Sequence, residues 1–223
     1  GNSEITSFDE FQYFTGVTSI GWDCFGGCSN MESITFPEKG ITITRSFDNC
    51  TKLKRANNTK NCIFINASFF YCSSLETIDL SNSPYLPAAM FSGCYSLKTI
   101  LFPKHMINYN NSVIGNVFSE CRSLVELDIP EGITSVGYAF VLNCNSLKYL
   151  TFPSTLTRAE SWFVGACPVL EWIRFKSVEP PTMTITKGII ANNSCVIYVP
   201  SQSVEAYKNA NYWKDYADRI AGY

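Results

Sequence analysis

The sequence predicts a solenoid of short parallel β-strands, on two observations. The chain repeats nearly one pattern seven times: an anchor Phe, a Cys three or four residues later, then a Leu, which is Met31 in the first unit, and in most units alternating apolar residues. The copies are marked by Cys28, Cys50, Cys72, Cys94, Cys121, Cys144 and Cys167, at steps of 22, 22, 22, 27, 23 and 23 residues. A unit of about 22 residues cannot bury its own apolar face, so the units must stack on one another.

Each unit predicts a short strand that starts five residues after its Cys. The apolar residues six and eight positions after the Cys share one strand face, and those at positions five and seven point the other way. In the first unit the inward residues are Ile34 and Phe36. Proline, which lacks an N–H and so ends the strand, follows in four units, as Pro37, Pro103, Pro130 and Pro153. The stacked strands predict a parallel sheet with one outward face.

A turn with further apolar residues follows each strand and leads to the next anchor. The anchors are Phe25, Phe47, Phe69, Phe91, Phe118, Phe140 and Phe163. A separation of three or four residues puts anchor and Cys on one side of a helical turn. Each Phe or Leu buried in the stack is expected to contribute roughly 1.5–3 kcal/mol.

Two units depart from the pattern. Repeat 2 has Ala56 and Asn58 at the inward positions, which predicts a weakly packed or displaced strand. Repeat 4 has five residues more than the first three steps, and its surplus falls in residues 104–117. We expect that segment to leave the solenoid as a loop.

Composition indicates one soluble, elongated domain. The repeats run from Phe25 to Phe175 without room for a linker, and 46% apolar with 16% charged residues argues against disorder. With 17 basic and 19 acidic residues and no basic run, the chain has no electrostatic footprint for nucleic acid or an anionic membrane. No apolar stretch is long enough to span a bilayer. Because the chain starts at Gly1 with no basic or apolar leader, we expect any targeting signal to lie outside this sequence.

The repeat pattern F-x-x-C-x-S-L-x-x-I-x-F-P resembles the cysteine-containing leucine-rich repeats of the BspA-like family. That family is also described from Treponema and is found on secreted or surface proteins of Bacteroides relatives. The resemblance covers nearly the whole chain. It implies a leucine-rich-repeat solenoid, a right-handed curved superhelix of short parallel strands with short helical turns, capped by a C-terminal helix.

The expected organisation is a single continuous domain in three parts. Residues 1–24 form an N-terminal half-repeat or cap, residues 25–176 hold the seven repeats, and residues 177–223 form the C-terminal cap. A cap is also required physically, because the last repeat would otherwise expose an apolar end. Between Ser203, a candidate N-cap, and Ile220, the apolar residues fall roughly on one helical face: Val204, Tyr207, Trp213, Ala217 and Ile220.

The cysteines and the one histidine give little support for an active site. Stacked cysteines point in parallel, so we expect buried thiols rather than disulfides in the ladder. Cys24 aligns with Ala139 and is expected to fill the core, and Cys24 with Cys28 lacks a second pair for zinc. His105 lies in the inserted segment without a catalytic partner motif and is expected to be solvated. We therefore predict no catalytic residue, no cofactor and no metal.

The outward face of the strands is the best candidate for a binding surface. Its first column reads Ser33, Arg55, Thr77, Thr99, Glu126, Tyr149 and Trp172, and its second reads Thr35, Asn57, Asp79, Leu101, Asp128, Thr151 and Arg174. Acids and then a Tyr, Trp and Arg gather toward the C-terminal end, a composition typical of interaction hot spots. The candidate partner-binding residues are Glu126, Asp128, Tyr149, Thr151, Trp172 and Arg174. The alternative is that the cap or the Pro180–Pro181 segment covers Trp172.

Three function classes stay open. The first is a non-enzymatic secreted or surface-anchored protein, for example a lipid-anchored outer-membrane protein, that mediates protein–protein interaction or adhesion through its strand face. Its partner would be a protein or a glycan, with a host extracellular-matrix protein as one candidate. The second is a carbohydrate-binding module, supported by Tyr149 and Trp172. The third is a structural spacer with no ligand of its own, and an enzyme ranks last.

Overall fold

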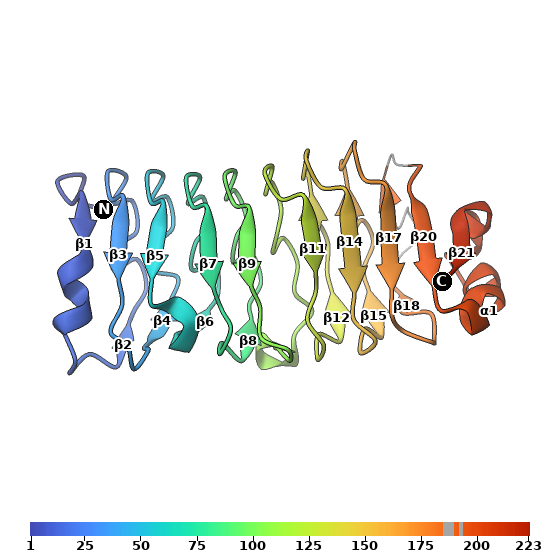
Figure 1. Cartoon of the computed structure of the whole chain (residues 1–223), viewed down its shortest axis with the longest axis horizontal. Helices are drawn as coiled ribbons and strands as arrows, with labels where there is room; N and C mark the ends of the chain where they lie inside the picture. Colours follow the sequence, from blue (N-terminus) through green and yellow to red (C-terminus); the bar gives the residue numbers. More distant parts are fainter. Residues whose placement is uncertain (185–189, 192–193) are drawn as a thin grey trace.

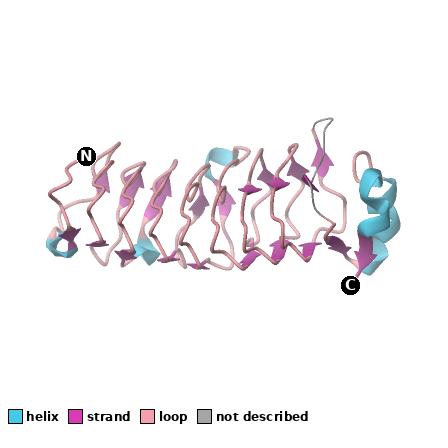
Figure 2. Ribbon diagram, turned by 90° about the horizontal axis from the view of Figure 1, so that it is seen from above, coloured by secondary structure: helices cyan, strands magenta, loops and turns pink. Residues whose placement is uncertain are grey.

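The computed structural model describes residues 1–184, 190–191 and 194–223 as one elongated coil of stacked repeats (Figures 1 and 2). The seven sequence-predicted strands lie in its principal ladder, which three further strands extend at the two ends, and the pairings are parallel. The ladder consists of two five-stranded sheets. The first holds β1 (Ser7–Phe8), β3 (Ser33–Thr35), β5 (Arg55–Asn57), β7 (Thr77–Asp79) and β9 (Thr99–Leu101). The second holds β11 (Glu126–Asp128), β14 (Tyr149–Phe152), β17 (Trp172–Phe175), β20 (Val196–Val199) and β21 (Ile220–Gly222).

Shorter strands line the other sides of the coil (Figure 2). Three run in the order β2 (Ser19–Ile20), β4 (Thr42–Thr44) and β6 (Ile63–Ile65), and β8 (Tyr85–Leu86) pairs with β10 (Ile107–Asn108). Two further groups are β12 (Ser135–Val136), β15 (Arg158–Ala159) and β18 (Thr182–Met183), and β13 (Val141–Leu142), β16 (Val164–Gly165) and β19 (Ile190–Ala191). The predicted leucine-rich-repeat solenoid is confirmed.

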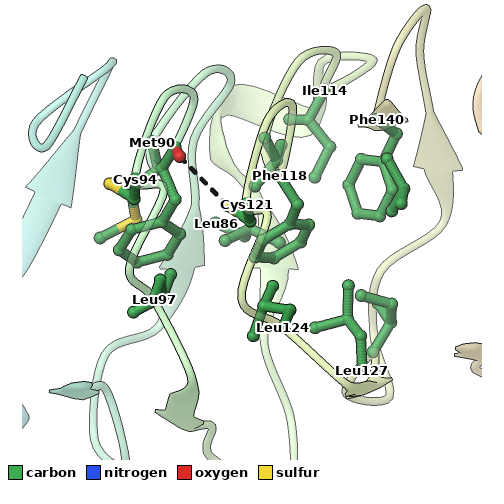
Figure 3. Packing of buried hydrophobic residues seen from close by; sticks show 14 of the residues in the cluster. Leu86, Met90, Cys94, Leu97, Ile114, Phe118, Cys121, Leu124, Leu127 and Phe140 are labelled. Carbon is green, nitrogen blue, oxygen red and sulfur yellow. Dashed lines mark hydrogen bonds between the residues drawn. The ribbon is translucent and has the colours of Figure 1, made fainter. Parts of the chain in front are cut away.

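The turns stack as regularly as the strands. Phe25 and Phe47 have ring centroids 5.3 Å apart at an interplanar angle of 10°, and the stacking continues through Phe69 and Phe91. From Cys50 to Cys144, each ladder thiol donates a hydrogen bond to the carbonyl oxygen of the preceding anchor, as Cys72 Sγ does to Phe47 O at 3.0 Å. The same bond joins Cys121 to the preceding turn (Figure 3). The cysteines of this ladder are therefore buried hydrogen-bond donors, as expected.

One cysteine outside the ladder departs from expectation. Cys24 is exposed rather than part of the core. The residue at the same place in repeat 2 is the buried Ser46, whose hydroxyl reaches back to Gly21 O in the preceding unit. Cys24 belongs to the first unit and has no complete repeat in front of it to cover it.

The inserted segment of repeat 4 mostly stays in the solenoid, so the expectation of a protruding loop is wrong. Met106 and Ile114 are fully buried, and Asn108 is 2% exposed and bonds Ser135 O and Thr134 N. The stretch around the 3-10 helix η3 (Tyr109–Asn111) lies at the surface, and the side chains of Lys104, His105 and Asn116 are exposed as well. The apolar side chains of this segment anchor it to the core on either side of the bulge.

The weak strand of repeat 2 is confirmed. β5 pairs with β3 along its full length but meets β7 only through Arg55 and Thr77. Beyond that point the chain turns at Asn58, whose φ is 59°, into the 3-10 helix η2 (Thr59–Asn61). Ala56 and Asn58 lack the inward bulk that holds the neighbouring strands in register.

The C-terminal end is not one continuous helix. It comprises η4 (Ser201–Ser203), the short helix α1 (Val204–Asn209), η5 (Lys214–Arg219) and then β21, so Ile220 is a strand residue. The helix stops because Ala210 is extended and Tyr212 has a φ of 68°. This bend returns Trp213 onto Tyr207, with ring centroids 4.9 Å apart, and both side chains are buried. Ser203 precedes the helix, but its side chain makes no capping bond.

Candidate binding surface

The outward strand face is closed at its N-terminal end. The 3-10 helix η1 (Asp9–Tyr13) lies beside β3, and the Asp9 carboxylate accepts hydrogen bonds from Ser33 Oγ at 2.8 Å and Thr35 Oγ1 at 2.7 Å. Both hydroxyls are buried as a result. On β3, the hydroxyl groups of the outward face are therefore already bonded within the chain.

An aromatic and cationic cluster lies at the opposite end, on β14, β17 and β20. The rings of Tyr149 and Trp172 stack with centroids 5.1 Å apart and an angle of 26°. Tyr198 meets Trp172 edge-on at 6.3 Å. We call Tyr149, Trp172, Arg174, Tyr198 and Tyr223 the aromatic cluster. It continues the outward columns, since Trp172 is in register with Tyr149 and Arg174 with Tyr198.

Arg174 is held between two rings of this cluster. Its guanidinium carbon lies 4.9 Å from the centroid of Trp172 and 4.9 Å from that of Tyr223. Its Nε is buried and has no hydrogen-bond partner among the residues that the structure describes. Cation–π contacts of this kind contribute about 0.5–1 kcal/mol each at exposed sites, so they fix the guanidinium in place.

Charged side chains border the cluster. Tyr149 Oη donates to Glu171 Oε2 at 3.3 Å, and Glu171 Oε1 lies 3.6 Å from Lys148 Nζ. Both members of this ion pair are about half exposed, so the pair adds little stability but keeps Glu171 over the Tyr149 hydroxyl. The cluster therefore has an apolar centre and a polar rim, the arrangement usual in interaction surfaces.

A cleft of about 360 Å³ lies where the principal ladder is interrupted, between β9 and β11. Figure 1 shows these two strands farther apart than their neighbours. Glu126 and Asp128 stand on the β11 side, and Asp128 Oδ1 is 3.2 Å from Lys176 Nζ. Glu131 lines the cleft at the end where β9 and β11 finish. Burial tends to raise the pKa of its carboxyl, but hydrogen bonds from Ser154, with the charge of Lys176, hold that pKa below its ordinary value.

Comparison with known proteins identifies the repeat. The family model described as a BspA type leucine rich repeat region matches six copies over residues 3–116 and 107–212. The chain belongs to the BspA-type leucine-rich repeat family. None of the curated proteins compared with the chain matches it.

Solved leucine-rich repeat proteins resemble this BspA-type chain. A leucine-rich cell surface protein from Faecalibacterium prausnitzii is 16% identical, with a TM-score of 0.51 over 85% of this chain and 61% of that protein. A Treponema pallidum leucine-rich repeat protein is 20% identical, with a TM-score of 0.48 over 93% and 79% of the two chains. One from Bacteroides ovatus is 20% identical, with a TM-score of 0.46 over 71% and 52%. The chain thus spans about half the length of the B. ovatus protein.

The predicted site residues of this BspA-type chain separate into two places. Tyr149, Trp172 and Arg174 meet in the aromatic cluster, and all three are partly exposed. Glu126 and Asp128 are exposed and border the cleft, while Thr151 is buried between strands, at 7% exposure.

The cap does not bury Trp172, which stays partly exposed although Tyr198 lies edge-on against its ring. The indole N–H of Trp213 donates to Pro181 O, and its ring packs on Phe175 with centroids 4.9 Å apart. Phe175 faces inward, so Trp213 closes the end of the core and does not lie over the outward face. The alternative in which the cap or the Pro180–Pro181 segment buries Trp172 is therefore wrong.

Sequence reasoning missed Tyr198 and Tyr223. The signal for Tyr198 was present in the run from Val196 to Pro200, which repeats the strand-and-proline pattern of the earlier units. Tyr223 reaches the cluster because β21 adds to β20, with Tyr223 N donating to Val199 O. Nothing in the repeat pattern indicates that last pairing.

The geometry does not support a chemical role for the buried cysteines or for His105. Burial raises the pKa of Cys50 to about 12 and of Cys62 to about 11, so these thiols stay neutral and unreactive near neutral pH. His105 is exposed, as expected. Among the described residues, no three His, Cys, Asp or Glu side chains form a group that could hold a metal ion. In the same part of the chain, every helix is too short or too polar to cross a lipid bilayer.

Proposed function

We propose that this chain is a non-enzymatic recognition module that binds a protein partner with its aromatic cluster, in a protein displayed at a cell surface. The observation that carries the proposal is the exposed stack of Tyr149 and Trp172 with Arg174 held against it. Tyr, Trp and Arg are the residues most enriched at interaction hot spots. Surface display is supported by the family and by the description of the F. prausnitzii protein as a cell surface protein.

Pre-organisation supports the same proposal. Side chains that are already fixed lose little conformational entropy when a partner binds. Arg174 is held by two rings, and Tyr149 by its stacking and by Glu171. On β3, at the N-terminal end of the same face, Asp9 already occupies the hydroxyl groups of Ser33 and Thr35.

A glycan is the second candidate ligand. Aromatic rings next to carboxylate and hydroxyl groups suit stacking and hydrogen bonding to a sugar, and the cluster supplies both through Trp172 and Glu171. Against this, Tyr149 and Arg174 each lie over part of the Trp172 ring and reduce the open face on which a sugar would stack. We rank a protein partner first for that reason.

A binding screen of the purified chain against immobilised extracellular-matrix proteins and a glycan array tests the proposal. The test variant carries Trp172→Ala and Arg174→Ala. Trp22 and Arg45 form a second exposed Trp–Arg pair, 5.7 Å from guanidinium carbon to ring, so a Trp22→Ala and Arg45→Ala variant is the matched control.

We expect a protein ligand that binds the chain and the control but binds the test variant at least tenfold more weakly. The melting temperature of the test variant should change little, because the removed side chains lie outside the core. Binding that survives in the test variant would exclude the aromatic cluster. A hit confined to the glycan array would replace the protein partner with a carbohydrate.

A further inference from the structure

The geometry points to a second binding site, the cleft between β9 and β11, that takes an extended peptide segment as an inserted strand. The segment would place apolar side chains against Ile100 and Phe102 and a basic side chain opposite Glu126. The cleft lies on strands other than those that carry most of the aromatic cluster, and this inference does not depend on the function proposed above.

The backbone of β9 offers hydrogen-bonding groups to the cleft. Leu80 N donates to Leu101 O at 2.8 Å, so Leu101 faces β7. Residues alternate along a parallel strand, which turns the N–H and C=O of Ile100 and the N–H of Phe102 toward the cleft. In repeats 1, 3 and 5, the N–H at the place of Phe102 bonds the next strand, as Phe36 N does to Asn57 O at 3.1 Å.

The backbone of β11 faces the same opening. Ile129 N donates to Thr151 O, and Lys148 N donates to Val125 O, so these residues face β14. The N–H and C=O groups of Glu126 and Asp128 therefore point at the cleft. In the part of the chain that the structure describes, these groups have no backbone partner across the opening. Two unpaired strand edges facing each other are a template for an added strand.

The opening is bounded at both ends. On the turn side, Phe91 N donates to Val117 O at 3.0 Å, and Cys121 Sγ to Phe91 O at 3.3 Å (Figure 3). At the other end His105 pairs with Glu131, and Met106 N donates to Glu131 O at 2.8 Å. A slot closed in this way excludes the long edge of a folded sheet, such as that of a second copy, but admits a flexible segment.

The floor of the cleft is apolar. Ile100 and Phe102 are partly exposed, whereas their counterparts Leu127 and Ile129 on β11 are 3% and 1% exposed. The volume of about 360 Å³ lies within the roughly 300–1,000 Å³ usual for ligand pockets. In an inserted strand every second side chain points inward, so apolar residues at alternate positions would cover Ile100 and Phe102.

The rim carries an excess of negative charge. Three carboxylates line the cleft, against two ammonium groups: Glu126, Asp128 and Glu131 against Lys104 and Lys176. Lys176 is already paired with Asp128. Glu126 is exposed and forms no ion pair with any described residue. The outward side chains of the inserted segment should therefore include Lys or Arg next to Glu126.

Selection from a random displayed peptide library against the intact chain tests this inference. We expect enriched peptides in which apolar residues alternate with residues that include Lys or Arg, without a central Pro. Their affinity should fall at least tenfold for Glu126→Lys, an exposed change, and for Ile100→Asp. It should not change for the matched control Glu205→Lys on α1, nor for the Trp172→Ala and Arg174→Ala variant.

N-methylation of the best peptide, one position at a time, tests insertion itself. A strand bonded on both sides uses every central N–H, so each central N-methyl group should weaken binding. Loss at alternate positions alone would mean pairing with one edge and would overturn insertion. The site is also overturned by no enriched peptide, by peptides that bind Glu126→Lys unchanged, or by self-association of the chain that Ile100→Asp abolishes.

Discussion

The principal ladder is disturbed at two places, and the two differ in how the chain fills them. In repeat 2, Thr59 Oγ1 donates to Asp79 O at 2.7 Å and accepts from Asp79 N at 3.3 Å. Thr59 is 1% exposed, and Asn58 Nδ2 donates to Phe36 O. Thr59 stands at the position that Pro103 holds in repeat 4. A proline side chain can form no hydrogen bond like that of the Thr59 hydroxyl, and the backbone groups that face the β9–β11 cleft stay unpaired.

The two hollows have similar volumes, about 380 Å³ in repeat 2 and 360 Å³ in repeat 4. Their linings differ. Asn57, Asn58, Thr59, Lys60 and Asp79 make the first polar, while Ile100 and Phe102 give the second an apolar floor. Volume alone therefore does not distinguish a defect whose backbone groups are already bonded by side chains, as in repeat 2, from a cleft that could bind a ligand. The distinction is whether side chains already satisfy the backbone groups that the missing pairing leaves unbonded.

The largest expected difference is in the free energy of unfolding, between a core substitution at the end of β7, which is paired with β9, and one at the end of β9, which is not paired with β11. Leu80 is fully buried, and Leu80→Ala should lower the free energy of unfolding by about 2–5 kcal/mol. Phe102 holds the same place on β9 but is partly exposed, so Phe102→Ala should cost less than Leu80→Ala although it removes more atoms. Urea unfolding of both variants measures this. An equal or larger loss for Phe102→Ala would mean that the cleft is closed in solution.

The next effect concerns the seal of repeat 2. Thr59→Val keeps the shape of the side chain but leaves the partly buried N–H and C=O of Asp79 without the Thr59 hydroxyl as their partner. We expect a loss of about 1–3 kcal/mol in the free energy of unfolding. Thr99→Val on β9 is the matched control, and since Thr99 is exposed it should stay within about 0.5 kcal/mol. Equal effects of the two substitutions would remove the distinction between a sealed and an open defect.

The smallest effect per residue is the change of stability with pH that the cysteine ladder causes. The hydrogen bonds of this ladder continue beside both defects. An unfolded thiol ionises near pH 9.0, while burial raises the pKa of Cys50 to about 12. Between these values the unfolded state loses its proton first, so the free energy of unfolding is constant below pH 9 and falls as pH rises toward 12. The slope is at most about 1.4 kcal/mol per pH unit for each such thiol.

Cys50→Ala should make this alkaline slope shallower without changing its onset. Denaturant titrations at pH 7, 8, 9 and 10 measure it. A slope that is unaffected by the substitution would mean that Cys50 ionises as readily in the fold as in the unfolded chain.

Much of this fold could be predicted because each unit repeats the same short-range pattern. The alternation around Ile34 and the proline after Phe36 determine where a strand lies and ends, and both can be read within one repeat. The outward position of Trp172 follows from the same alternation. These features depend on residues a few positions apart, so the sequence shows them directly.

Features that depend on contacts between distant residues were not predictable in this way. The surplus in repeat 4 was recognised, but its burial rests on Asn108 reaching Ser135, which no local pattern indicates. The C-terminal turn at Tyr212 and the addition of β21 to β20 are likewise long-range. They bring Tyr223 to Arg174 across 49 residues of sequence, and so complete the aromatic cluster.

The interruption at β9 and β11 also has a mechanical consequence. The two five-stranded sheets of the ladder are joined there by the stacked turns and by the pairing around His105. The described residues of β9 and β11 form no strand hydrogen bonds with each other. Between the other neighbouring strands, bending toward or away from the strand face must stretch backbone hydrogen bonds, of which the β5–β7 pair has the fewest. At this joint it need not, so the bending stiffness of the rod is lowest there, and a pull on its two ends would be taken up first as a change of angle between the two sheets.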